Sequence, residues 1–300
     1  YFCFGDTYAG SGMAWPWNNN AILYTDSFDF SQGIDFDGHV EGIATTHNFG
    51  QKKLQITPDT ALESNYPDIV TRAYHPGTEM DREEGAVVGT STCIPTGAIE
   101  VNGSFYVFYM EVTDWNFGST GQWCIHSNRV MKSTDGGKTF SQLDSLKWDY
   151  AAAPNFGQIF PMEAGDYIYI YGLRGGRMSS LKLGRVKKAD FENMAEYEYY
   201  VGTENGEPVF LKGNEGLEYI LVDREETSSV IYGPCGEMSI AYNEYLSQYV
   251  ALYQMGTSIV LRTSDTPYGP FSQVDTVFVN GEFGLNDAYC AFTHPKMMNA

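Results

Sequence analysis

One pattern recurs along this sequence and limits what the chain can fold into. It consists of a short apolar strand, a turn that contains Asp, and a Phe soon after the turn. The four copies lie at residues 21–32, 129–143, 182–194 and 259–274. A strand, a tight turn and a second strand form a β-hairpin, and the aromatic residue can pin that hairpin to its neighbours. The repeat therefore predicts an all-β protein built from successive hairpins.

The second copy contains a stricter motif. Residues 133–140, STDGGKTF, fit the pattern S-x-D-x-G-x-T-F that is known as an Asp-box. Asp135 and the glycines suit a sharp turn, and Phe140 can pack beneath the sheet. The motif marks the hairpins of β-propellers and usually lies away from the chemistry, so we interpret its role as structural.

Further alternating apolar strands precede the later turns, at residues 104–112, 166–173 and 248–255. With the hairpins they outline four-stranded units at 1–48, 90–148, 150–205 and 230–280. A fifth unit would combine residues 285–300, sequence beyond them and strands at the N-terminal side, since closure protects the sheet edges of a propeller. The predicted fold class is all-β, a five-bladed β-propeller, as a single domain over residues 1–300 that lacks some flanking sequence at both ends.

Two segments depart from this plan. Helical periodicity is weak everywhere except at residues 189–199, where it spans about three turns. Residues 49–90 are rich in Pro, Asp, Glu and Thr and indicate a long loop with irregular strands, which is commonly functional when it is ordered. No apolar run reaches the length of about 18 residues that a membrane span needs, so neither a span nor a signal peptide is predicted.

Charge and cysteine usage narrow the class of partner. Asp and Glu outnumber Lys and Arg by 38 to 18, and the net charge of −20 repels phosphate backbones and anionic membranes. A polysaccharide or oligosaccharide fits better, because sugars are bound by aromatic faces and hydrogen-bonding side chains. The five cysteines form no C-x-x-C pair, which argues against a zinc site and gives no disulfide framework. We predict no cofactor and no metal ligands.

Candidate site residues follow the apolar strands that would face a propeller channel. Asp6 comes directly after the strand 2–4 and Gly5, although an Asp there can also cap its own turn. Trp17, Asn19 and Asn20 resemble a sugar platform, with one flat face and several amides, but they are also ordinary loop residues. At comparable points of the later units we expect further ligand-binding side chains, namely Thr96, Gln158, Arg174, Arg177 and His294.

Cleavage of a glycosidic bond commonly needs two carboxyl groups, one acid and one base or nucleophile. Asp6 with Glu237 is the preferred catalytic pair, because Glu237 lies beside Gly236 at the start of a strand and would be partly desolvated. Glu111 is the reserve. Glu237 could equally be a buried carboxylate that is hydrogen-bonded to its neighbours, and His126 and His294 are more often structural than ligating.

Many segments resemble one family, the domain of unknown function 4185 family, in the family's own order. They are FGDT at 4–7, PWNNNA at 16–21, PTGAIEVNGSFYVFYM at 95–110, STDGGKTF at 133–140, NFGQ at 155–158, YIYIYGLRGGR at 167–177, LGRV at 183–186, GEMSIAYNEYL at 236–246, LRTSDTPYGPFS at 261–272 and THPK at 293–296. The resemblance implies a fold related to five-bladed glycoside hydrolases and, for some members, endo-acting D-arabinanase activity. It also implies an extracellular or cell-surface location.

The resemblance assigns Asp6 as a catalytic carboxylate, because it is the Asp of the family's GDT motif. The family's second catalytic Asp precedes a Trp-x-x-Asn stretch that matches residues 17–20, and Pro16 stands there in this sequence. Either Glu237 or Glu111 takes that role, or the substrate differs, or the protein binds glycan without cutting it. Related propellers can hold a cation on the channel axis, but no ligand cluster in this sequence demands one.

A sialidase is the third interpretation. It draws on the Asp-box and on Arg174, Arg177 and Arg262, because sialidases direct three Arg at the carboxylate of their substrate. They usually carry several Asp-boxes, however, and this chain has one strict copy. The discriminating observation is whether the three guanidinium groups point at a common position.

Overall fold

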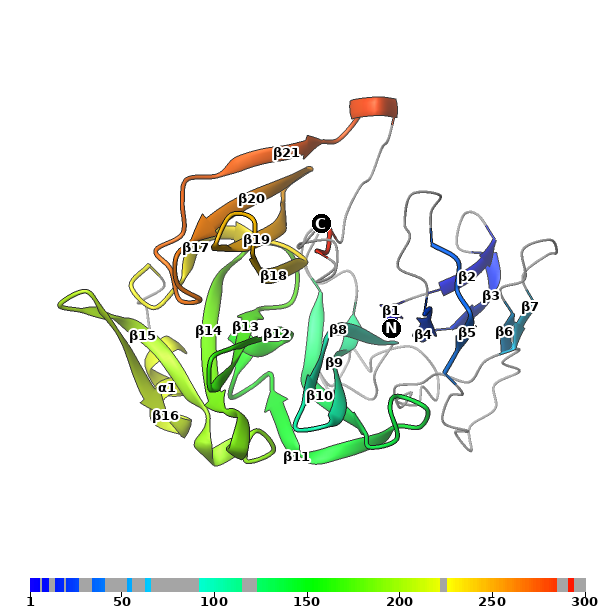
Figure 1. Ribbon diagram of the computed structural model, residues 1–300, viewed down its shortest axis with the longest axis horizontal. Coiled ribbons are helices and arrows are strands. Elements are labelled where there is room, and N and C mark those ends of the chain that lie inside the picture. Colours follow the sequence, from blue (N-terminus) through cyan, green and yellow to red (C-terminus); the bar gives the residue numbers. More distant parts are fainter. Residues whose placement is uncertain are drawn as a thin grey trace, which may run out of the picture. The chain divides into compact units, whose positions relative to one another are not determined.

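Strands provide nearly all of the regular structure in the computed structural model. The described residues are 1–5, 7–10, 14–18, 20–26, 34–40, 53–55, 63–65, 92–114, 123–221, 226–284 and 291–293. The chain divides into two compact units, residues 1–114 with 125–144 and residues 115–124 with 145–300. Figure 1 labels the elements along the chain.

The first unit begins with short strands. Strands β1 (Phe2–Phe4), β4 (Ala21–Tyr24) and β5 (Gly38–His39) form an antiparallel sheet in the order β1-β4-β5. Two hairpins accompany it, β2 (Thr7–Gly10) with β3 (Ala14–Asn18), and β6 (Lys53–Gln55) with β7 (Glu63–Asn65). The last pair lies within the segment that the sequence predicts to hold irregular strands.

A longer antiparallel sheet follows, in the order β11-β10-β9-β8. Its strands are β8 (Thr92–Val101), β9 (Ser104–Asp114), β10 (Cys124–Ser133) and β11 (Ser141–Asp149). Within the first unit the side chains of Val107, Tyr109 and Met131 are fully buried against Ile22 and Cys93. The pairing of β8 with β9 shifts between Pro95 and Gly97, which is the signature of a β-bulge at Thr96.

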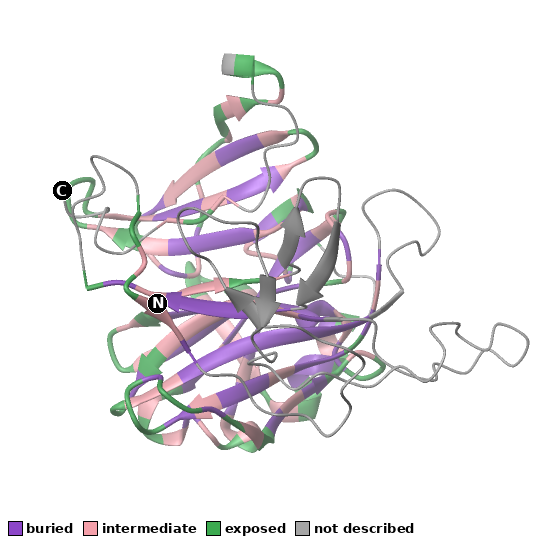
Figure 2. Ribbon diagram, turned by 90° about the vertical axis from the view of Figure 1, so that its right-hand side faces the viewer, coloured by how far each residue is buried: buried purple, intermediate pink, exposed green. Residues whose placement is uncertain are grey.

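The second unit holds two larger sheets. One has the order β12-β13-β14-β15-β16, with β17 also paired to β14; the strands are β12 (Gln158–Ala164), β13 (Tyr167–Leu173), β14 (Ser179–Lys187), β15 (Glu198–Glu204), β16 (Glu207–Lys212) and β17 (Ile231–Cys235). The other comprises β18 (Met238–Asn243), β19 (Gln248–Met255), β20 (Ser258–Ser264) and β21 (Asp275–Val279). Figure 2 shows buried residues along the strands and exposed residues at the turns.

These sheets have the connectivity of propeller blades. Strands β8 to β11, β12 to β16 and β18 to β21 are neighbours both in sequence and in their sheets, as in an up-and-down blade. The all-β prediction is therefore confirmed, and the strands follow a β-propeller arrangement. Four sheets of three or more strands occur among the described residues. Most of the segment 285–300, which the sequence assigns to a fifth unit, lies outside those residues.

The expected helical segment at residues 189–199 is wrong. The segment instead holds the 3₁₀ turns η2 (Lys188–Asp190) and η3 (Met194–Glu196) and the start of β15. The extended backbone of Asn193, the N-cap of η3, separates the two turns. The helix is instead α1 (Gly213–Leu221), which buries Leu217 and Ile220. Helix α1 is too short for a clear periodicity. Two more 3₁₀ turns occur: η1 (Pro154–Phe156) lies between β11 and β12, and η4 (Glu282–Gly284) follows β21. No described helix is long and apolar enough to cross a membrane.

The Asp-box folds as a self-contained turn between β10 and β11. The Asp135 carboxylate accepts the Thr139 backbone N–H at 2.9 Å, the Thr139 hydroxyl at 2.6 Å and the Ser133 hydroxyl at 2.7 Å. The hydrogen bonds from Thr139, followed by that from Ser133, hold the pKa of Asp135 well below its usual range. Phe140, at the end of the motif, packs into the core of the first unit.

Replacing Asp135 by Asn should destabilise the protein at neutral pH. A neutral amide cannot accept the charge-assisted hydrogen bonds that Thr139 and Ser133 donate to the carboxylate. The folded-state pKa is lowered, so the stabilisation is present above the unfolded pKa of about 3.9 and is lost as pH falls through the folded value. The difference in free energy of unfolding between wild type and Asp135→Asn should therefore shrink below about pH 4 in denaturant titrations. Asp166→Asn, in the exposed β12–β13 turn, is the control. A difference that is unchanged with pH would contradict the assignment.

A second prediction concerns thiol reactivity. Burial raises the pKa of the Cys235 thiol to about 12, so almost no thiolate forms at pH 8. In the native protein, iodoacetamide should leave Cys235 unmodified while it labels the partly exposed Cys124, as read by peptide mass spectrometry. Both should react in guanidinium chloride. Labelling of the two at equal rates in the native protein would show that β17 opens readily.

Candidate functional site

In an antiparallel sheet, the ends of three consecutive strands lie together at one end of the sheet, which we call the shared edge. The start of the first strand, the end of the second and the start of the third lie together, because each strand reverses the direction of the last. In the sheet of β8 to β11 this edge carries Cys93, Glu111 and His126, and Cys93 pairs directly with Glu111. Among the predicted site residues that the structure describes, those at such strand ends are Glu111, Gln158, Arg174, Arg177 and Glu237.

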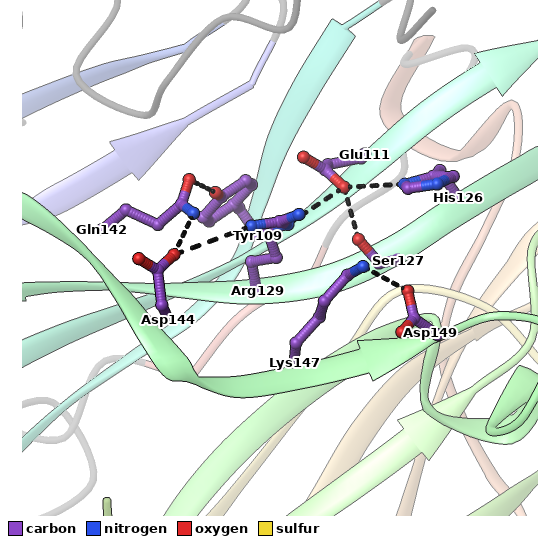
Figure 3. Close-up of polar contacts among 9 residues, drawn as sticks. All are labelled: Tyr109, Glu111, His126, Ser127, Arg129, Gln142, Asp144, Lys147 and Asp149. Carbon is purple, nitrogen blue, oxygen red and sulfur yellow. Dashed lines mark hydrogen bonds and ion pairs between the residues drawn. The ribbon is translucent and has the colours of Figure 1, made fainter.

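Glu111 is the centre of a polar cluster in the first unit. Its Oε2 atom lies 3.1 Å from His126 Nδ1 and 3.3 Å from Arg129 Nε, and it accepts a hydrogen bond from the Ser127 hydroxyl. Figure 3 shows these three contacts meeting at one carboxylate oxygen. The Glu111 side chain is 11% exposed and that of His126 is 50% exposed. Glu111 is thus an almost buried acceptor with one partner that reaches solvent.

The same network continues across β10 and β11. Arg129 Nη1 lies 4.0 Å from Asp144 Oδ1, and Gln142 Nε2 donates to that oxygen at 2.6 Å. The Tyr109 hydroxyl donates to Gln142 Oε1 at 3.2 Å. Burial raises the pKa of Tyr109 well above its usual value, with further contributions from Cys93 and Glu111, so its hydroxyl stays a donor. Arg129 therefore lies between the carboxylates of Glu111 and Asp144.

Two N-terminal segments reach the start of β8. A Cβ atom on Gly5 would lie 3.0 Å from Ile94 Cγ2, so the backbone of Gly5 is packed against that side chain. Asn20 Nδ2 donates to the Cys93 carbonyl at 3.1 Å, and Asn20 is buried. Asn128 Nδ2 lies 3.4 Å from Thr96 Oγ1. Asn20 and Glu111 thus both lie beside Cys93, and Thr96 lies three residues further along β8.

The remaining candidates come from both ends of the chain. Asp6, Asn19 and His294 lie outside the described residues. Trp17 lies in β3 opposite Tyr8, and Pro16 lies in the same strand. The proposed catalytic role of Asp6 therefore stays a prediction.

Glu237 has a specific partner in the second unit. Arg177 Nε donates to Glu237 Oε2 at 2.8 Å, and Arg177 Nη2 donates to Oε1 at 2.7 Å, which is a bidentate pair. The Arg177 guanidinium also lies over the Trp123 ring, 5.4 Å from its centroid. The sequence alternative that Glu237 is a hydrogen-bonded carboxylate thus agrees with these contacts. Its predicted role as an acid stays a prediction.

Strand register explains why Arg177 and Glu237 meet. β14 pairs with β17 through Ser179 and Cys235, and continuing this antiparallel register by two residues places Arg177 opposite Glu237. A Cβ atom on Gly236 would lie 3.1 Å from both Arg177 Cγ and Gln254 Cβ. Because Gly236 has no side chain, the segments that carry Arg177 and Gln254 can approach it this closely.

The side chain of Gln158 holds the loop that carries Arg174 and Arg177. Gln158 Nε2 donates to the carbonyls of Arg174 at 2.7 Å and Gly176 at 2.8 Å. Arg174 Nε donates to Asn155 Oδ1 at 2.8 Å. Gln158 and Arg174 therefore shape the loop between β13 and β14, and Arg177 alone among these three contacts Glu237.

The three guanidinium groups of the sialidase interpretation each have a different partner. Arg174 binds Asn155, Arg177 binds Glu237, and Arg262 donates to the Tyr253 hydroxyl at 2.9 Å and the Ser272 carbonyl at 2.7 Å. These contacts give no support to a shared site for a substrate carboxylate.

Sequence reasoning missed the partners of the two carboxylates. His126 was expected to be structural, and Ser127, Arg129 and Trp123 were not singled out. The usable signal was position, because Glu111 ends one strand and His126 lies near the start of the next. Among the described residues, no group of three or more His, Cys, Asp or Glu side chains could hold a metal ion.

The fold and the two carboxylate clusters define an all-β protein with a β-propeller arrangement. The chain belongs to the family of the domain of unknown function DUF4185, whose model matches residues 1–300. The family resemblance seen in the sequence is thereby confirmed. No curated protein matches the sequence.

Among solved structures, a provisionally assigned hydrolase from Bacteroides ovatus ATCC 8483 has a TM-score of 0.57 at 15% identity, over 97% of this chain and 70% of that one. An exo-β-1,3-galactanase from Phanerochaete chrysosporium has a TM-score of 0.38 at 10% identity, over 62% and 36%. A β-xylosidase/α-arabinofuranosidase from a compost metagenome has 0.30 at 13%, over 61% and 77%. The first match supports the fold alone, and the two weaker ones support no conclusion about this chain.

The Arg177–Glu237 pair should stabilise the second unit. Arg177→Lys removes the bidentate geometry around a carboxylate that is 15% exposed, and we expect it to lower the free energy of unfolding by about 1–3 kcal/mol. Lys212→Gln breaks the more exposed Lys212–Glu196 pair and should cost less than about 1 kcal/mol. Denaturant titrations measure both. Equal small effects would indicate that the Arg177 pair contributes no more than a surface contact.

Proposed function

We propose that the protein is a glycoside hydrolase-like protein that acts on a neutral polysaccharide, with an arabinofuranose-containing glycan as the first candidate. The observation that carries this proposal is the cluster around Glu111 at the shared edge of β8, β9 and β10. There an imidazole and a hydroxyl contact an almost buried carboxylate, and the Asn20 amide and the backbone of Gly5 pack against the start of β8. These are the groups that bind sugar hydroxyls and move protons.

The proposed catalytic carboxylate is Asp6, by its position in the GDT motif at residues 5–7. Glu237 is the candidate for the second carboxyl group, with Glu111 in reserve. The remaining candidates, Trp17, Asn19, Asn20, Thr96, Gln158, Arg174, Arg177 and His294, are proposed to bind or shape the site for the glycan. This assignment rests on strand position and on the family motif.

We also propose a single five-bladed propeller domain that works outside the cell or at its surface. The fifth blade would be completed by the segment 285–300, which continues after the last strand of the β18–β21 sheet. The net charge of −20 suits a neutral glycan better than a nucleic acid or an anionic membrane. A structure extended at either end would test the blade count.

A non-catalytic glycan-binding propeller is the second candidate function. Two observations favour it: Pro16 stands where the family resemblance expects an Asp, and both oxygens of Glu237 are hydrogen-bonded to Arg177. A carboxylate held in this way is suited to fixing a loop. The two candidate functions differ in turnover and not in binding.

Hydrolysis by the purified protein distinguishes them. Arabinan, arabinogalactan and related neutral glycans are incubated with wild type, and released reducing ends are measured. Asp6→Asn should lower the rate by about 100-fold or more while glycan affinity is retained, because a proton-transferring group is lost. Asp275→Asn, an exposed carboxylate in β21, should leave the rate unchanged. Binding without release of reducing ends from any glycan would favour the non-catalytic function.

A further inference from the structure

Three side chains contact Glu111 Oε2, two of them by hydrogen bonds and Arg129 as an ion pair, and they differ in their access to solvent. Ser127 is fully buried, the Arg129 side chain is 22% exposed, and the His126 side chain is 50% exposed. His126 is therefore the member of the cluster that a ligand can reach most easily. The other two, which are more buried, contact the same carboxylate oxygen, as Figure 3 shows.

The contact with Glu111 decides which imidazole nitrogen carries the hydrogen. A carboxylate can only accept, so His126 Nδ1, 3.1 Å from Glu111 Oε2, must be the donor. In the neutral imidazole the other nitrogen, Nε2, then has a free lone pair and acts as an acceptor. The hydrogen bond thus prepares Nε2 to take a proton.

The charged groups around His126 support this arrangement. Glu111 on β9 faces it directly, Arg129 on β10 contacts the same carboxylate oxygen, and Asp144 on β11 lies on the far side of Arg129. The Arg129 guanidinium and the Ser127 hydroxyl fix the carboxylate, which then fixes the imidazole. When Nε2 gains a proton, the carboxylate of Glu111 stabilises the resulting imidazolium.

We propose that His126 and Glu111 form a proton-accepting dyad, in which Nε2 of His126 takes the proton of a hydroxyl group at the glycan site and Glu111 positions the imidazole. The identity of the ligand rests on the proposed function. The O–H bond breaks, its proton moves to Nε2, and the electron pair stays on the oxygen. If that oxygen is water, it attacks the anomeric carbon, and the departing glycosidic oxygen takes a proton from one of the carboxylic acids named in the proposed function.

This dyad answers the question raised by Pro16. Hydrolysis needs a second proton-handling group besides Asp6, and the family's second Asp is absent from the matching position. A carboxylate–imidazole pair performs that task without a carboxyl group facing the ligand. Glu111 thereby becomes a positioning residue, in place of the reserve catalytic role that the sequence suggests.

Nuclear magnetic resonance tests the dyad independently of any glycan. In full-length wild type, ¹⁵N chemical shifts of neutral His126 should report hydrogen on Nδ1, and Glu111→Gln should increase the Nε2-protonated form. Diethylpyrocarbonate should modify His126 several-fold more slowly in Glu111→Gln than in wild type. Hydrogen on Nε2 in wild type, or shifts and modification rates that Glu111→Gln leaves unchanged, would overturn the proposal.

His126→Asn supplies a matched control for the fold. The Asn amide can still donate to Glu111 from the position of Nδ1, but it lacks Nε2. We expect a thermal midpoint close to that of wild type together with a loss of about 100-fold in kcat on any glycan that wild type cleaves. The pH dependence of kcat should lose one of its ionisations. An unchanged kcat in His126→Asn, with Asp6→Asn inactive, would overturn the dyad and leave the hydrolase function standing.

The two proposals fail separately. If wild type cleaves no glycan, the hydrolase function fails, and the dyad is judged by the tautomer of His126 and by its protection from diethylpyrocarbonate. Protection by a bound arabinan oligosaccharide would support a hydroxyl-binding dyad in a non-catalytic propeller. Binding of that oligosaccharide without protection of His126 would overturn it.

Discussion

Antiparallel pairing decides which residues of this chain can meet. Because each strand reverses direction, a residue at the end of one strand lies beside a residue at the start of the next. Cys93 and Glu111 face each other for this reason, and the register of Ser179 with Cys235 leads directly to Arg177 and Glu237. Arg177 and Glu237 are 60 positions apart in the sequence, and the pairing of β14 with β17 makes them partners without any local motif.

Electrostatics explains how the two carboxylates tolerate their surroundings. An ionised group with little access to water is stable only when other groups replace the water that it loses. Glu111 receives a hydroxyl, an imidazole and a guanidinium, and Glu237 receives one guanidinium on both oxygens. In a chain with 20 more acidic than basic side chains, Arg129 and Arg177 are each placed beside one of these carboxylates.

Much of the fold could be predicted from the sequence, because its signals are local. The alternation at 104–112, 166–173 and 248–255 corresponds to β9, β13 and β19, and the turn chemistry of the Asp-box predicts the β10–β11 hairpin. The helix could not be found in this way. Helix α1 depends on burying Leu217 and Ile220 in a tertiary environment, whereas the more periodic segment 189–199 is interrupted by the Asn193 cap.

Individual residues of the candidate site could be predicted from the sequence, but their interaction partners could not. Glu111, Glu237 and Arg177 stand out because they flank apolar strands, yet nothing in the sequence states which strand lies beside which. A single histidine such as His126 forms no motif with a recognisable spacing, so the sequence does not identify it as a site residue. Its role depends on a neighbour 15 residues earlier, and that distance in sequence is fixed by the length of the loop between β9 and β10.

The bulge at Thr96 has a consequence for how the protein can change over evolutionary time. Before it, Pro95 shares a face with Tyr109, and after it Gly97 shares a face with Phe108, so the single extra residue reverses the inward and outward alternation of β8. Removing one residue there would exchange the inward-facing and outward-facing side chains, either in the half of β8 before position 96 or in the half after it. Strand β8 can therefore not change its length at residue 96, which closes this position to deletion.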